Sequence, residues 1–235
     1  MIPHDVPLRI GSLLFDGIDQ IDLTGPFEVL SRLPNATHRL YGRSLLPVRD
    51  VNGLRLLPDA TLTDAPCLDV LHVPGGFGQE ALMEDEAVLG WLRDQSAGAR
   101  RVFSVCTGAL LCGAAGLLRG RRATTHWSAL HLLPFFGAEP VEARVVADGS
   151  WLFAAGVTAG IDGALQLAAD LRGIETAQCI QLAIAYAPEP PFNSGLPGTA
   201  PPPVLAEARQ RVATITRQRE NTARRVADRL ARGLF

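Results

Sequence analysis

The fold is decided by one stretch of sequence, Arg101-Val-Phe-Ser-Val-Cys-Thr-Gly-Ala-Leu-Leu-Cys-Gly-Ala-Ala-Gly-Leu-Leu118. A short apolar, β-branched run leads to Cys106, and Thr107 and Gly108 then precede small residues that favour a helix. The pattern predicts a strand, a sharp turn and a helix, with Cys106 on the turn. A side chain there projects from the end of the sheet, and the N–H groups of the following helix point toward it.

A thiol in that position is suited to be a nucleophile. Free thiols titrate near ~8.5, and helix N-termini commonly lower this to roughly 3.5–7.5. A drop of about 2.5 units favours the thiolate by roughly 3.4 kcal/mol, which would make it the main species at neutral pH. The competing interpretation of Cys106 is a small buried side chain at a strand end, as for most free cysteines. The pattern by itself leaves both open.

The composition limits the classes of function. The chain has 235 residues, is 47% hydrophobic and carries a net charge of −2, so it can bury a large core and gives no reason to expect nucleic acid or a membrane as partner. Lysine is absent, which excludes Schiff-base chemistry on a lysine. The four cysteines form no metal-binding spacing, so we expect no metal. We expect Cys112 and Cys179 to lie in the core.

Neither a cleavable leader nor a membrane span is evident from the sequence. The first residues lack a basic segment that leads into an apolar one, and no apolar run reaches the ~18 residues that a span requires. We therefore expect a reduced, cytoplasmic protein.

A first strand is predicted over residues 8–15, ahead of Asp22-Leu-Thr-Gly-Pro26. Pro26 is typical of the first turn of a helix, here continuing to Leu33. Asp22 then falls at a connection between strand and helix, where open α/β sheets place their site residues. The residues alone favour an N-cap role for Asp22 over a catalytic one.

A glycine-rich loop, Gly75-Gly-Phe-Gly78, follows a buried-type strand at residues 68–74. Paired glycines let backbone amides face an anion or a polarised atom. The loop lacks GxGxxG spacing, and no phosphate loop occurs elsewhere, so nucleotide binding is not indicated.

His126 is the second candidate partner for the thiol. It lies 20 residues past Cys106, one helix and one strand later, and can return to the same end of the sheet. A thiol beside an imidazole is a common activated nucleophile. A residue that begins a helix and hydrogen-bonds locally explains His126 equally well.

The remaining segments predict an α/β fold with a mostly parallel sheet covered by helices on both faces. They comprise a helix over 79–99, a hairpin around Asp148-Gly149, and helices over 158–171 and 174–186. We expect residues 1–187 to form the α/β domain.

Residues 188–235 are expected to form a proline-rich arm and an amphipathic helix. Seven of the 17 prolines lie between 188 and 203, and the last helix carries eight arginines against three acidic residues. We favour a solvated arginine face whose apolar stripe packs on the body or on a second subunit over a nucleic-acid contact. The stripe comprises Leu205, Ala208, Val212, Ile215, Val226 and Leu230.

Several motifs together resemble the ThiJ/PfpI superfamily. They are Phe15-Asp-Gly, Asp22-Leu-Thr-Gly-Pro26, Val73-Pro-Gly-Gly76, Ser104-Val-Cys-Thr-Gly108, Ala114-Ala-Gly-Leu-Leu118 and Arg122-Ala-Thr-Thr-His-Trp127. The resemblance implies a flavodoxin-like sandwich with a cysteine on a nucleophile elbow. Within the superfamily, Ala185-Tyr-Ala-Pro-Glu-Pro-Pro-Phe-Asn193 and the arginine-rich last helix are most similar to the isocyanide hydratases.

That resemblance implies Cys106 as nucleophile, Asp22 as its acid/base partner and Thr107 as a hydrogen-bonding neighbour. It implies an isocyanide and water as substrates, no cofactor, and a homodimer with its sites near the subunit interface. We expect the amides of Gly76 and Thr107 to face developing charge. The expected binding residues are Gly75, Gly76, Phe77 and His126.

Two positions depart from the superfamily pattern. Thr107 stands where many of its proteases and chaperones carry histidine, which disfavours a peptidase. Phe77 and Glu80 are larger than the residues expected in the glycine-rich loop, which bears on substrate size or on the position of the loop.

Other activities remain open at this point. A cysteine-dependent glyoxalase or deglycase would pair the thiol with an early glutamate, where this chain has Asp22. A ligand-sensing regulator of the AraC type carries similar motifs, but its DNA-binding region needs on the order of 100 residues, and 48 follow Ala187. Redox sensing through Cys106 would be compatible with catalysis.

Overall fold

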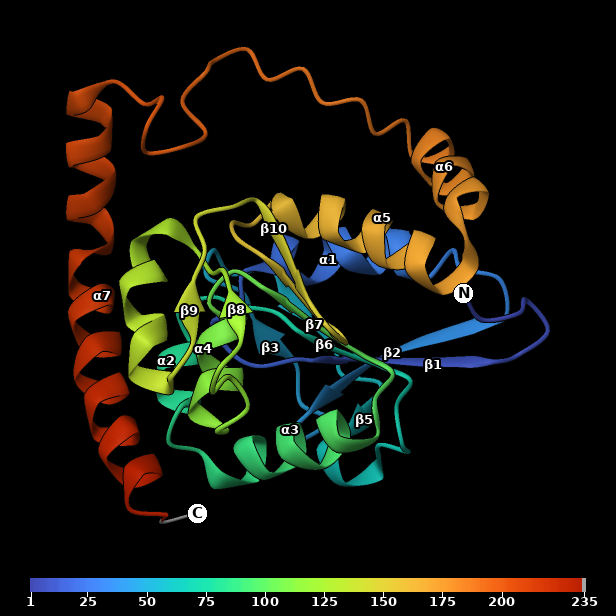
Figure 1. The fold of residues 1–235 in the computed structure, drawn as a ribbon, viewed down its shortest axis with the longest axis horizontal. Coiled ribbons are helices and arrows are strands. Elements are labelled where there is room, and N and C mark those ends of the chain that lie inside the picture. Colours follow the sequence, from blue (N-terminus) through green and yellow to red (C-terminus); the bar gives the residue numbers. More distant parts are fainter. Residues whose placement is uncertain (234–235) are drawn as a thin grey trace.

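The computed structural model describes residues 1–233, and its centre is a seven-stranded sheet (Figure 1). Every pairing in this sheet is parallel except that of β10 with β11, which confirms the mostly parallel sheet. The predicted hairpin at Asp148-Gly149 is this antiparallel pair. In order across the sheet, the strands are β10 (Val145–Asp148), β11 (Trp151–Ala154), β7 (Arg101–Val105), β6 (Val70–Val73), β1 (Leu8–Leu13), β2 (Ala36–Gly42) and β5 (Ala60–Thr61).

Helices cover both faces of the sheet, and each face has its own apolar cluster. One face packs against α1 (Gln20–Leu30), α5 (Ala159–Arg172) and α6 (Ile174–Ala183). The opposite face packs against α3 (Glu86–Gly98), α4 (Gly108–Ala114), the 3-10 segment η2 (Trp127–Phe136) and the second half of α7 (Pro202–Ala231). This is the flavodoxin-like arrangement that the motifs imply.

The shorter elements lie in the connections. They are β3 (Val48–Arg49) paired with β4 (Arg55–Leu56), β8 (Arg122–Ala123) paired with β9 (Glu139–Pro140), η1 (Leu62–Asp64) and α2 (Gln79–Leu82).

The first helix begins earlier than predicted. Asp19 caps α1 by accepting a hydrogen bond from the Ile21 amide, so Pro26 lies inside the helix and not in its first turn. Proline has no N–H to donate to the carbonyl four residues back, which here belongs to Asp22. The cap that the sequence favoured for Asp22 is therefore supplied by Asp19, and Asp22 is free for another role.

The single helix predicted over residues 79–99 is wrong, because the structure divides it into α2 and α3. Asp85 starts the second helix by accepting hydrogen bonds from the amides of Ala87 and Val88. An N-cap inside a helical pattern begins a new helix, and α2 is left as a separate turn.

Of the two cysteines expected in the core, Cys112 is buried and Cys179 is exposed. Cys179 lies on α6, which covers the end of α5 and buries mainly Ala177 and Ile180. The helical pattern around Cys179 was therefore correct, but the face assigned to this residue was wrong.

The C-terminal region consists of an arm and a long helix. Residues 187–201 contain no helix or strand, and in Figure 1 this arm leads from α6 across the molecule to α7 at the opposite edge. Ala223 and Val226 of α7 are buried, whereas the first half of the helix is largely exposed. Within the described residues, no helix is long and apolar enough to cross a membrane.

Candidate active site

Cys106 lies on a sharp turn between β7 and α4, as predicted. Its φ is +56°, a left-handed backbone conformation that is costly for a residue with a side chain. The Thr125 hydroxyl donates a 2.7 Å hydrogen bond to the Cys106 carbonyl. Gly108 lets α4 start close to β6, since a Cβ there would lie 2.0 Å from the Val73 carbonyl oxygen. The Thr125 hydrogen bond and the close packing at Gly108 thus hold the turn in its strained conformation.

Asp22 lies in the first turn of α1, directly beside this turn. Its side chain is fully buried beside the Cys106 thiol, on which it acts electrostatically, and within the described residues Asp22 Oδ1 has no hydrogen-bond partner. Asp22 Oδ2 accepts a 3.0 Å hydrogen bond from the Gly75 amide. The structure therefore brings together two residues that are far apart in the sequence, a carboxyl group and a thiol, in one enclosed space.

The electrostatics of this pair differ from those expected of a cysteine at a helix N-terminus. Burial raises the pKa of Cys106 well above its usual value, and the negative charge of Asp22 raises it further. The Thr107 amide and the charge of Arg219 act in the opposite direction. Burial likewise raises the pKa of Asp22, with Asp19 adding to the effect. The prediction that the thiolate dominates at neutral pH omitted this burial.

Thr107 and the glycine-rich loop are joined by hydrogen bonds. The Gly76 amide donates a 3.2 Å hydrogen bond to Thr107 Oγ1, and this hydroxyl lies 3.3 Å from the Gly76 carbonyl oxygen, to which it donates. The Gly76 amide, which we expected to face developing charge, already has a partner within the protein. Gly75 must be glycine, because a Cβ there would lie 2.5 Å from the Thr107 nitrogen.

His126 behaves as a helix-start residue. It caps η2, with its Nδ1 2.8 Å from Ser128 Oγ, and its ring packs against Trp127. Burial lowers its pKa to about 4, and the charge of Arg219 acts in the same direction, so the ring is neutral at neutral pH. No hydrogen bond within residues 1–233 joins His126 to Cys106 or Asp22.

Phe77 and Glu80 face α7. The Phe77 ring is 52% exposed, and the guanidinium carbon of Arg219 lies 5.9 Å from its centre. Glu80 accepts a short hydrogen bond from the Thr222 hydroxyl of α7. The larger residues of this loop therefore provide contacts for the C-terminal helix.

Arg219 is a residue of this site that its sequence pattern did not single out. Its side chain is 3% exposed and donates to the Gly76 carbonyl oxygen at 2.6 Å, to Gln79 Oε1 at 3.0 Å and to Thr107 Oγ1 at 3.4 Å. A signal was present, since the apolar stripe of this helix passes from Ile215 to Val226 across position 219. An arginine at a stripe position is placed to face the body.

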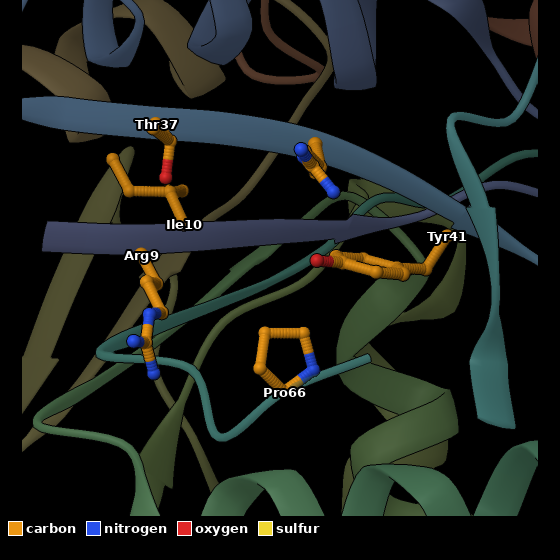
Figure 2. A pocket seen from close by; sticks show the side chains of 6 residues that line it. Arg9, Ile10, Thr37, Tyr41 and Pro66 are labelled. Atoms are coloured by element: carbon orange, nitrogen blue, oxygen red, sulfur yellow. The ribbon is translucent and has the colours of Figure 1, made fainter. Parts of the chain in front are cut away.

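Two surface hollows lie away from Cys106. One, of about 310 Å³, lies beside β1 and β2 (Figure 2), and its lining comprises Arg9, Ile10, Thr37, Arg39, Tyr41 and Pro66. The other, of about 440 Å³, lies between α6 and the connection that follows α1. In the described part of the chain, no three His, Cys, Asp or Glu side chains are grouped so as to hold a metal ion.

The chain is similar to known proteins over nearly its whole length. The chain is 52% identical over 223 residues to an isonitrile hydratase of Pseudomonas putida, which covers 95% of this chain and 98% of that protein. A crystal structure of a ThiJ/PfpI family protein from Pseudomonas syringae superposes with a TM-score of 0.91 at 41% identity, covering 94% of this chain and 93% of that one.

A more distant similarity concerns a regulator. The HTH-type transcriptional regulator GbdR of Pseudomonas aeruginosa is 32% identical over 192 residues, which are 77% of this chain but 51% of the regulator. Residues 9–170 match the model of the DJ-1/PfpI family. With the cysteine turn, the buried carboxyl beside it and this match, the chain belongs to the DJ-1/PfpI family.

Proposed function

We propose that the protein is an isocyanide hydratase, which converts R–N≡C and water into an N-substituted formamide. The observation that carries this proposal is the placement of the buried Asp22 carboxyl group beside the Cys106 thiol on its strained turn. An isocyanide adds a nucleophile and a proton at the same terminal carbon, so it requires both groups at one place. The similarity to the isonitrile hydratase of Pseudomonas putida supports the same reaction.

In the first step, the Cys106 sulfur attacks the terminal carbon while its proton passes to Asp22. Asp22 then delivers that proton to the same carbon, which gives the covalent thioimidate R–N=CH–S–Cys106. Because burial raises the pKa of Asp22, this carboxyl group is able to carry the proton between sulfur and carbon.

In the second step, the ionised Asp22 accepts a proton from water as the water oxygen adds to the thioimidate carbon. Asp22 passes that proton to the nitrogen, giving R–NH–CH(OH)–S–Cys106. The C–S bond then breaks while the hydroxyl proton returns to the sulfur, which releases R–NH–CHO and the Cys106 thiol. The water supplies both the oxygen and the hydrogens of the product, so no cofactor is consumed. Thr107 and the loop of Gly75 and Gly76 keep Asp22 and Cys106 in place.

A homodimer is part of this proposal. The tail exposes apolar side chains that a second copy of the chain would cover, with Leu182 82%, Phe192 77% and Leu196 60% exposed. These residues lie on α6 and on the arm. Sedimentation equilibrium at micromolar concentration should give twice the mass of one chain, and a single-chain mass would contradict the dimer.

The reaction is tested by mixing the purified protein with a simple aryl isocyanide and following formamide by chromatography. Cys106→Ala is run in parallel, with Cys179→Ser as a matched control on an exposed thiol. Cysteine-dependent formamide production supports the proposal. Turnover of methylglyoxal without turnover of several isocyanides would assign the site to a glyoxalase or deglycase instead.

A further inference from the structure

We propose that Arg219 of α7 is a positioning residue for the nucleophile, providing the positive charge that balances the negative charge held between Cys106 and Asp22. It does so from the C-terminal helix, which reaches the site through the glycine-rich loop. This inference rests on the proposed role of Cys106.

The Arg219 guanidinium is buried among neutral hydrogen-bond acceptors. Arg219 is nearly fully buried, and its hydrogen-bond acceptors are neutral: the Gly76 carbonyl, the Gln79 amide and the Thr107 hydroxyl. Within residues 1–233, no carboxylate lies within the 4.0 Å of an ion pair with it. A buried charge without a counter-charge is strongly unfavourable. The fold therefore has to provide negative charge nearby.

That charge is provided by the site itself. The groups whose negative charge favours the charged form of Arg219 are Cys106, Glu80 and Asp22. The relation is reciprocal, because the charge of Arg219 lowers the pKa of both Cys106 and Asp22 against the effect of burial. Arg219 is thus the cation beside a thiol and a carboxyl group that can share one negative charge, with Glu80 as a further negative group near it.

Arg219 also contacts the residues that hold Cys106 and Asp22 in place. Its Nη2 donates to the Gly76 carbonyl oxygen at 2.6 Å, next to Gly75, whose amide holds Asp22. The same Nη2 reaches Thr107 Oγ1, and Thr107 directly follows Cys106. Arg219 therefore fixes the glycine-rich loop against the cysteine turn as well as placing a charge there.

The half of α7 that follows Arg219 is fixed to the body of the protein, which places Arg219 at the site. Downstream of Arg219, Thr222 donates to Glu80, and Glu84 receives hydrogen bonds from Arg225 at 2.7 Å and from Arg229 at 3.1 Å. Upstream of Arg219, no residue of α7 is fully buried. The packed half of the helix thus begins at the residue that enters the site.

The experiment measures alkylation of Cys106 by iodoacetamide as a function of pH, which requires no isocyanide. The exposed thiols are first removed with Cys67→Ser and Cys179→Ser, and modification of Cys106 is followed by mass spectrometry. Arg219→Gln is compared with Arg217→Gln, the same substitution at an exposed position of the same helix. Arg219→Lys serves as the variant that keeps the charge.

We expect Arg219→Gln to raise the apparent pKa of alkylation by about 1 unit or more, with about tenfold slower alkylation at neutral pH. Arg217→Gln should match the parent, and Arg219→Lys should lie closer to the parent than Arg219→Gln does. Added ethylguanidinium should restore part of the rate to an Arg219→Ala variant. Circular dichroism confirms that each variant is folded.

Identical pH profiles for Arg219→Gln and Arg217→Gln would overturn the inference. So would an Arg219→Lys profile shifted as far as that of Arg219→Gln, since charge would then not be the cause. Should Arg219→Gln fail to fold, the Lys and Ala comparisons decide the same question. Absence of formamide production by the parent protein would instead refute the isocyanide reaction and leave the alkylation result unaffected.

Discussion

The cysteine turn and the C-terminal helix both reach the same small space, but they are built in different ways. The turn is local, because β7, Cys106 and α4 are consecutive in the sequence and their pattern identifies them. The contribution of α7 is long-range, since Arg219 and Thr107 are 112 residues apart and meet only in the folded chain. The comparison teaches that the cysteine turn is encoded locally, whereas its surroundings depend on the packing of the tail.

Removal of the Cys106 thiol should give the largest loss of activity, and it tests the part of the site that is encoded locally. Cys106→Ala leaves no group that can bond to the substrate carbon, so we expect formamide production to fall by about 10³-fold or more. Steady-state kinetics measure this loss. Retention of more than a tenth of the activity would exclude a covalent mechanism, and Cys179→Ser should be unaffected.

Removal of the proposed proton carrier, Asp22, should give the next largest loss of activity. Asp22→Asn keeps the size of the side chain but cannot shuttle a proton, and general acid–base groups commonly contribute about 10²–10⁴-fold. We expect a loss in that range in kcat. The matched control is Asp19→Asn, since asparagine is an equally good N-cap. Equal losses in the two variants would show that the α1 terminus, and not the proton, matters.

His126 sharpens the comparison because it caps η2 and its pKa is affected by the charge of Arg219. Its pKa is lowered to about 4 by burial, so the folded protein favours the neutral ring. Between pH 6.5 and 4 the unfolded chain binds the extra proton, and stability must therefore fall as the pH falls through this window, by at most about 3.4 kcal/mol from this residue.

This pH dependence is checked by urea unfolding at several pH values. His126→Asn keeps an N-cap but does not titrate, so its unfolding free energy should fall less between pH 6.5 and 4 than that of the parent. His38, whose pKa burial lowers to about 3, would continue to contribute in the variant. Parallel curves for parent and variant would contradict the assignment.

The smallest loss of activity should come from breaking the ion pairs that hold α7 to Glu84. Glu84 joins Arg225 and Arg229 at an exposed position, and exposed ion pairs contribute little. We expect Glu84→Gln to lower activity a few-fold at most, and the difference from the parent should vanish at high salt because salt screens the pair. A loss as large as that of Asp22→Asn would mean that the tail governs the site more strongly than the turn does.

The parts of the site that the sequence could predict are those with a local signature. The strand, turn and helix around Cys106 follow from β-branched residues, a turn and small residues in succession. The geometric pairing of Asp22 with Cys106 did not follow from the pattern of residues, which favoured a cap. Once the structure shows that Asp19 supplies the cap, the burial of Asp22 beside the thiol is explained.

Other features could not be predicted because they depend on which surface is covered. The pKa of Cys106 depends on how deeply the turn is buried, and the exposure of Cys179 depends on how much of α6 the body covers. Arg219 was hidden among eight arginines of the tail, and only docking of α7 distinguishes it from its neighbours. Periodicity shows which face of a helix is apolar, but not what that face will meet.

The position of Arg219 in the chain also has a consequence for biosynthesis. A ribosome makes the chain from the N-terminus, so all seven strands of the sheet and Cys106 are complete before Arg219 is added. A nascent chain can therefore form its cysteine turn while the balancing charge is still absent. On the proposed role of Arg219, the reactivity of the thiol is then set only after α7 has been synthesised and has docked on the body.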